Sequence, residues 1–70
     1  MRLSQLERQL AAAGFVYVRH SSRGHPIYAD RHGHTLTVSA HGGRTKVFSH
    51  NELVAIWRTV ARLQEQETPA

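Results

Sequence analysis

The spacing of apolar residues changes along the chain, from a helical spacing at both ends to an alternating one in the middle. Leu3, Leu6 and Leu10 recur three and four residues apart, which places them on one side of a helix. Residues 35–40 instead alternate apolar and polar side chains, as a half-buried strand does. A second helical stripe consists of Leu53, Ile56, Trp57, Val60 and Leu63. The pattern predicts a sheet placed between two helices in the chain.

Short polar motifs predict where the two helices begin and end. Ser4 with Glu7, and again Ser49 with Glu52, have the S-x-x-E spacing of a capping box. Gly14 follows the first apolar stripe and suits the left-handed conformation in which many helices end. We therefore expect a helix within the first 13 residues with Ser4 as its N-cap, and a second helix that begins after Ser49.

The middle of the chain divides into three segments with strand character. Residues 15–20 and 25–29 are rich in aromatic and β-branched side chains, and residues 35–40 alternate. Residues 21–24 and 30–33 separate these segments, and both contain the Gly, Ser or Asp typical of tight turns. Because such short connections join only antiparallel strands, the three segments predict a meander.

These elements define the expected fold class. A chain of 70 residues is long enough for one small domain. We expect an α+β two-layer α-β-β-β-α sandwich, with a three-stranded antiparallel sheet and both helices packed on one face. Residues 1–65 form this domain, and residues 66–70 are expected to fray. If Val16, Val18, Leu36 and Val38 face the helices together with Ile27, His25 falls on the same side as Ile27. Either His25 then precedes the regular alternation of its strand, or a different set of side chains faces the helices.

Positive charge is concentrated in the middle of the chain. The net charge is +4, and the charges outside residues 15–50 cancel. Within that stretch Asp30 is the single acid, and the basic residues are Arg19, Arg23, Arg31, Arg44 and Lys46. A positive sheet and its loops suit a phosphate backbone, although a solvated basic face is the plainer alternative.

Composition excludes several classes of protein. The chain has no cysteine, which excludes a disulfide framework, a thiolate zinc finger and a cysteine nucleophile. It lacks an apolar run long enough to span a bilayer, and its polar start does not resemble a secretory signal. We expect a cytoplasmic protein that does not bind a membrane.

Histidine is the abundant acid/base group, with six copies between positions 20 and 50. Its imidazole can exchange a proton near neutral pH without a metal. In RNA cleavage the 2'-hydroxyl can be the nucleophile, so one histidine beside cationic side chains supplies the groups that the reaction needs. His32 and His34 flank a tight turn, where solvated side chains are commoner than zinc ligands, so we expect neither a metal nor another cofactor.

Three short runs, residues 14–19, 23–28 and 36–43, resemble the HicA family of toxins, also called YcfA-like proteins. The resemblance extends over residues 3–63 and includes the order of helices and strands. It implies a fold similar to a double-stranded-RNA-binding domain. It also implies a ribosome-independent mRNA interferase, with mRNA as substrate and a HicB-like antitoxin protein as partner.

The resemblance also implies roles for single residues. His25 matches the family's catalytic histidine, although Arg23-Gly24 stands where Gly-Ser is usual and Pro26 follows it. His41 matches a His-Gly element that positions RNA or contacts the antitoxin. The residues expected to bind RNA are Arg19, Arg23, Arg44, Lys46, Tyr28 and His41.

Two alternatives stay open from the sequence. The same fold can serve as a non-catalytic RNA-binding module, or as a module that binds another protein. Tyr17 and Tyr28 can either stack on bases or pack within the sheet.

Overall fold

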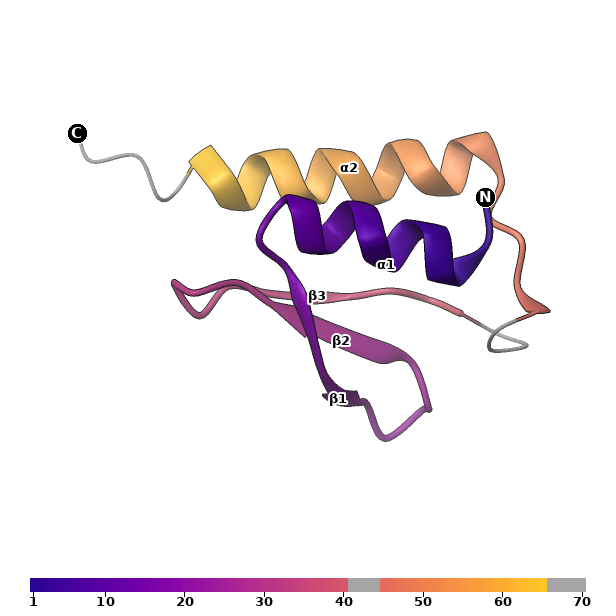
Figure 1. The fold of residues 1–70 in the computed structure, drawn as a ribbon, viewed down its shortest axis with the longest axis horizontal. Coiled ribbons are helices and arrows are strands. Elements are labelled where there is room, and N and C mark those ends of the chain that lie inside the picture. The colour runs from indigo at the N-terminus through magenta and orange to yellow at the C-terminus, as the bar shows by residue number, and fades with distance from the viewer. Residues whose placement is uncertain (41–44, 66–70) are drawn as a thin grey trace.

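The elements follow one another in the predicted order. A computed structural model describes residues 1–40 and 45–65. It contains α1 (Leu3–Ala12), β1 (Val16–His20), β2 (Pro26–Ala29), β3 (Thr35–Thr37) and α2 (His50–Glu65) (Figure 1). The expectations for His41, Arg44 and the segment 66–70 lie outside the described residues.

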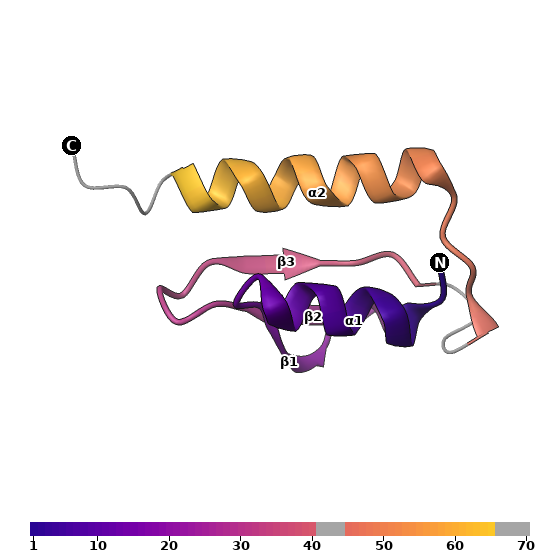
Figure 2. The ribbon, with the colours of Figure 1, turned by 45° about the horizontal axis from the view of Figure 1, so that its top comes forward.

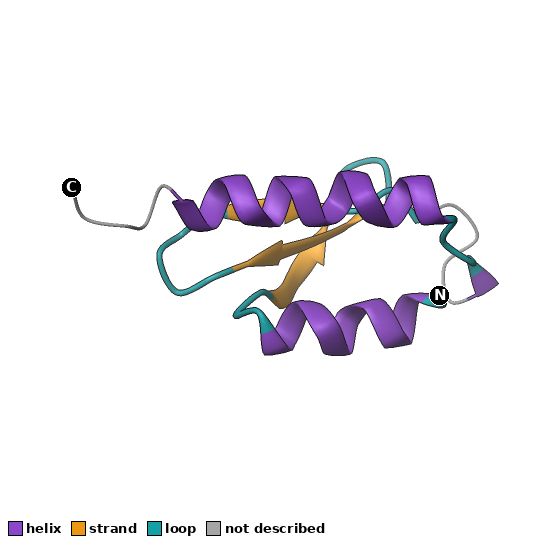
Figure 3. Ribbon diagram, turned by 90° about the horizontal axis from the view of Figure 1, so that it is seen from above, coloured by secondary structure: helices purple, strands orange, loops and turns teal. Residues whose placement is uncertain are grey.

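The three strands form one antiparallel sheet in the order β1-β2-β3. Both helices lie on the same side of this sheet, and they run in the same direction (Figures 1 and 2). Figure 3 looks down on this side and shows the strands between the two helices. The predicted α+β fold, with a three-stranded antiparallel meander and a helix at each end, is confirmed.

Helix α1 ends as predicted but begins earlier than predicted. At its C-terminus the Phe15 N–H donates to the Leu10 carbonyl at 2.8 Å, and Gly14 has φ +96, which is the geometry of a Schellman cap. At its N-terminus the prediction of Ser4 as N-cap is wrong, because Arg2 occupies that position and its N–H donates to Gln5 Oε1 at 3.0 Å.

The earlier start of α1 has a cause in the tertiary structure. The N-terminal residues pair with the segment that precedes α2, through a bridge between Arg2 and Val47. The Phe48 N–H donates to the Met1 carbonyl at 2.7 Å, and the Met1 ammonium donates back at 3.3 Å. This pairing holds Arg2 in an extended conformation, so the helix can begin at the next residue.

The predicted capping box of α2 is confirmed. The Ser49 N–H donates to Glu52 Oε1 at 2.9 Å, and the Glu52 N–H donates to Ser49 Oγ at 3.2 Å. Lys46 Nζ lies 2.8 Å from Glu52 Oε2, so the same carboxylate also binds the segment before the helix. The hydrogen bond from Lys46 and the capping bond with Ser49 lower the pKa of Glu52 to about 2.

The core lies between the sheet and the helices and is closed by the apolar stripes of both helices. Leu36 and Val38 face the helices as predicted, and Trp57 packs partly buried against the core. The buried apolar side chains are Leu3, Leu6, Leu10, Phe15, Tyr28, Leu36, Val38, Ala40, Phe48 and Val60.

Val16, Val18 and Ile27 do not face the helices, so the second alternative from the sequence, a different helix-facing set, is the one observed. Val16 and Val18 are 58% and 53% exposed, and Ile27 is only half-buried. Tyr28 is the β2 residue that enters the core, and strand alternation turns its neighbour Ile27 to the other face. Val16 pairs with Ala29 and therefore shares that open face, whereas Val18 falls in an irregularity of the strand.

Candidate functional site

The hairpin of β1 and β2 carries two arginines and two histidines and, over residues 16–29, no carboxylate. Its turn is closed by the Ser21 N–H, which donates to the His25 carbonyl at 2.8 Å. The Gly24 N–H donates to the Ser21 carbonyl at 2.9 Å, and Gly24 takes φ +81, a conformation that favours glycine. The turn leaves Arg23 exposed, close along the chain to Arg19 and His25.

His25 lies at the end of this turn, immediately before β2. Its backbone N–H donates to Ser21 Oγ at 3.2 Å, which fixes the main chain there. The residue is half-buried, and its Nε2 atom is shielded from solvent. In this conformation a substrate therefore cannot reach Nε2 unless the imidazole ring turns.

A β-bulge in β1 brings Tyr17 and His20 together. Residues three apart in a regular strand point to opposite faces. The pairing shifts between Tyr17 and Arg19, so that Val18 is an extra residue and His20 turns to the same face as Tyr17. The Tyr17 hydroxyl lies 2.6 Å from His20 Nδ1, and the two rings meet edge to face at 5.3 Å.

This pair lines a groove of about 760 Å³ between α1 and the hairpin. The groove mixes charged, hydroxyl and aromatic groups. Its walls include Arg2, Ser4 and Glu7 on one side and Tyr17, His20 and Pro26 on the other.

Tyr28 supports this groove from the core. Its ring is 1% exposed, which leaves no face for an RNA base, and its hydroxyl donates to Glu7 Oε2 at 2.8 Å. Burial, followed by the hydrogen bond and charge of Glu7, raises the pKa of Tyr28 well above its usual value. Tyr28 is expected from the sequence to contact RNA, but its buried ring cannot stack on a base. Its hydroxyl instead holds Glu7 in place.

The basic residues divide among separate parts of the molecule. Arg19 and Arg23 are exposed on the hairpin, whereas Arg31 lies in the other turn, between β2 and β3. Lys46 contacts Glu52 at 2.8 Å and lies 5.4 Å from the centre of the Phe48 ring, so its ammonium is held at the start of α2. Among the described residues, Arg19 and Arg23 are therefore the cations that can bind an anion at the hairpin.

The turn between β2 and β3 is held by Asp30. Its Oδ1 accepts from the N–H groups of His32 and His34 at 3.0 and 2.9 Å, and its Oδ2 lies 3.0 Å from His34 Nδ1. Asp30 and His34 thus stabilise the turn. In the ranges 1–40 and 45–65 we find no three His, Asp or Glu side chains that could hold a metal ion together.

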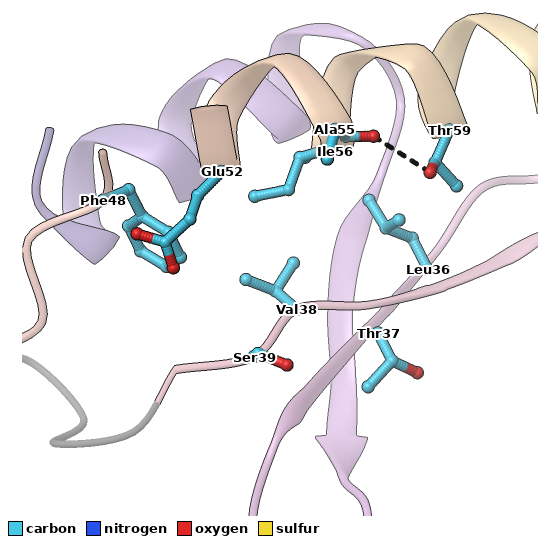
Figure 4. Close-up of a pocket in the computed structure, with 9 residues that line it drawn as sticks. All are labelled: Leu36, Thr37, Val38, Ser39, Phe48, Glu52, Ala55, Ile56 and Thr59. Carbon is cyan, nitrogen blue, oxygen red and sulfur yellow. Dashed lines mark hydrogen bonds between the residues drawn. The ribbon is translucent and has the colours of Figure 1, made fainter. Parts of the chain in front are cut away.

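A second groove, of about 260 Å³, lies between β3 and α2 and is mainly apolar (Figure 4). Leu36 and Val38 reach toward Ile56 in this view, while Thr37 points away from the helix. Its acidic member, Glu52, is already bound to Ser49 and Lys46, so this groove offers little chemistry.

Glu7, Tyr17 and His20 belong to no motif that would mark them as a site in the sequence. From the sequence, Tyr17 can either stack on a base or pack within the sheet. The bulge that pairs it with His20 cannot be predicted from the spacing of the residues. A carboxylate on the first turns of a helix, such as Glu7, is also common for reasons of helix stability alone. These groups become a site only through the tertiary fold.

The chain was compared with protein-family models, curated proteins and solved structures, and it matches none of them. The fold and the hairpin describe a small α+β domain whose edge hairpin carries arginine and histidine side chains. No helix in the described ranges is both long and apolar enough to cross a membrane.

Proposed function

We propose that the protein is a metal-independent endoribonuclease, the toxin of a HicA-type toxin–antitoxin pair. Its resemblance to that family supports this function. The observation that carries it is the β1–β2 hairpin, which presents Arg19, Arg23, His20 and His25 without a carboxylate among residues 16–29. Such a hairpin attracts a polyanion and supplies groups that can transfer protons.

The open face of the sheet extends this surface. Arg19 pairs with Ile27, and Ile27 pairs with Thr37, so the three side chains form a row across the sheet on the side away from the helices. Thr35 is exposed on the same face, beside Ala29. An arginine and two hydroxyls along one face can contact phosphates and 2'-hydroxyls of RNA.

Cleavage would proceed through the RNA's own 2'-hydroxyl. A base removes its proton, the 2'-oxygen attacks the adjacent phosphorus, and the bond to the 5'-oxygen breaks as that oxygen is protonated. The products are a 2',3'-cyclic phosphate and a 5'-hydroxyl. His25 acts as base or acid after its ring turns toward the substrate, and Arg19 and Arg23 stabilise the charge on the phosphorane. Lys46 stays with Glu52 in this scheme, and His41 and Arg44 keep the roles that the resemblance implies.

The test is the cleavage of a 5'-labelled RNA, in EDTA, by the wild type and by His25→Ala. We expect the substitution to slow cleavage by about 100-fold or more, because that is the usual contribution of a general acid or base. His50→Ala is the matched control, since His50 is exposed at the start of α2. Unchanged cleavage by His25→Ala, with normal folding, would refute the assignment of His25.

A non-catalytic RNA-binding module is the second candidate, and the buried Nε2 of His25 favours it. The same assay separates the two functions, because binding of the RNA without any cleavage by the wild type supports the module. Expression in cells addresses the partner: we expect growth arrest by the wild type that a co-expressed HicB-like antitoxin relieves. Arrest that is unchanged by such an antitoxin would contradict the proposed pair.

A further inference from the structure

We propose that the groove between α1 and the β1–β2 hairpin binds a guanine base of single-stranded RNA, stacked on Tyr17 and read by Glu7. This inference deepens the proposed function, on which it rests for RNA as the ligand. The groove, of about 760 Å³, lies within the size range of sites that bind small ligands. The hairpin contributes Tyr17, His20 and Pro26 to its wall.

Tyr17 is the platform in this arrangement. Tyr17 is 49% exposed and lines the groove, so a ligand in the groove can reach it. Two contacts fix the ring: its hydroxyl lies 2.6 Å from His20 Nδ1, and it meets the Tyr28 ring edge to face at 6.2 Å. A ring held in place in this way stacks on a base with little loss of entropy.

Glu7 is the group that reads the base. Its Oε2 accepts the Tyr28 hydroxyl at 2.8 Å, which holds the carboxylate at the groove wall. The raised pKa of Tyr28 keeps that hydroxyl protonated, so it continues to donate. An ionised carboxylate only accepts hydrogen bonds and has about four lone-pair sites, so both of its oxygens can still bind a ligand.

The chemistry of the four bases selects guanine. Its Watson–Crick edge carries two adjacent donors, the N1–H and the N2 amino group, which match the two oxygens of a carboxylate. Adenine and cytosine place an acceptor nitrogen beside their amino group. Uracil flanks its single N–H with two carbonyl oxygens, which a carboxylate repels. Arg2 and Ser4, on the same wall as Glu7, can contact the sugar and phosphate.

The experiment measures binding of hexanucleotides by the His25→Ala protein, so that no ligand is cleaved. The ligands are oligouridine, the same oligomer with one central guanosine, and the same oligomer with inosine in its place. We expect the guanosine to bind about tenfold more tightly than oligouridine, and inosine, which lacks the N2 amino group, to lose most of that gain.

Three variants in the same background test the proposed roles of Glu7 and Tyr17. Glu7→Gln keeps an acceptor for Tyr28 but breaks the match to two donors, so it should abolish the preference for guanosine. It should not weaken the binding of oligouridine, because it removes a charge that repels the uracil carbonyl oxygens. Tyr17→Ala should weaken all three ligands by about fivefold or more, because stacking tolerates any base, whereas Tyr17→Phe should largely retain binding. Gln9→Ala, on an exposed part of α1, is the control.

Equal binding of guanosine and uridine, or a preference that survives Glu7→Gln, overturns the inference. Its failure is distinct from failure of the proposed function. A wild type that cleaves RNA but shows no guanine preference remains a nuclease without this base site. A preference that depends on Glu7 in a protein that never cleaves RNA retains the base site and refutes the nuclease.

Discussion

Tyr28 combines a ring that completes the core with a hydroxyl that must keep a partner there. Strand alternation brings the ring inward, and Glu7 on α1 accepts the hydroxyl at 2.8 Å. Together with Pro26, Tyr28 forms the face of β2 that packs against the helices. It also turns a carboxylate of α1 toward the groove.

The high pKa of Tyr28 predicts a specific loss of stability in alkali. In the unfolded chain the phenol ionises near pH 10, whereas in the folded protein it keeps its proton. The contribution of Tyr28 is thus complete below pH 10 and falls as the pH rises further, because only the unfolded state releases the proton. We expect urea unfolding at pH 8 to 11 to show that the wild type has the higher free energy of unfolding at pH 8 and that its difference from Tyr28→Phe shrinks as the pH rises. An advantage that is constant over this range would contradict the burial of an un-ionised phenol.

The first turns of the two helices are capped differently, and this difference should be measurable in the free energy of unfolding. Ser49 accepts the Glu52 N–H, whereas Ser4 lies one residue inside α1, exposed, after the cap at Arg2. Ser49→Ala should lower the free energy of unfolding by about 1 kcal/mol. Ser4→Ala should change it by less than about 0.5 kcal/mol, as is usual for an exposed position. Equal losses from the two substitutions in urea unfolding would contradict the assignment of the caps.

The start of α2 should also respond to acid. The pKa of Glu52 is lowered to about 2 in the folded protein from an ordinary value of 4.5, chiefly by Lys46. Its contribution to stability is therefore present above pH 4.5 and is lost as the pH falls toward 2. Glu52→Gln should be less stable than the wild type at pH 7, and the difference should disappear near pH 2. Glu65→Gln, at the other end of α2, is the control, and an equal acid response there would refute the role of Lys46.

The sequence predicted the order and type of the elements because helical and alternating spacings are local signals. It failed at the N-cap of α1, where the pairing of Arg2 with Val47 sets the start of the helix. It also failed along β1, because the burial of Tyr28 turns Ile27 and Ala29 to the open face, and Val16 lies there with its partner Ala29. The bulge at Val18 then breaks the alternation of the strand. The same bulge pairs Tyr17 with His20, so the groove could not be predicted from spacing either. The start of α1 depends on a contact between residues far apart in the sequence. The extra residue in β1 has no residue type that would indicate it.

The positions of the charges across the molecule determine which surface would attract the proposed RNA ligand. The net charge is +4, yet the described arginines face different ways: Arg19 and Arg23 lie on the hairpin, whereas Arg58 is exposed on α2. The pairing of residues 1–2 with 47–48 ties the starts of the two helices together. The hydrogen bond from the Tyr28 hydroxyl to Glu7 joins the hairpin to α1.

This separation predicts how RNA binding depends on salt. Each arginine that neutralises a phosphate of a single strand releases counterions and adds about 0.7 to the slope of log affinity against log salt. Arg19→Ala and Arg23→Ala, each in the uncleaving His25→Ala background, should therefore reduce the slope by about that amount. Arg58→Ala removes the same charge from α2 and should leave the slope unchanged. If Arg58→Ala reduced the salt slope equally, RNA binding would depend on net charge alone. That result would refute the hairpin as the binding surface.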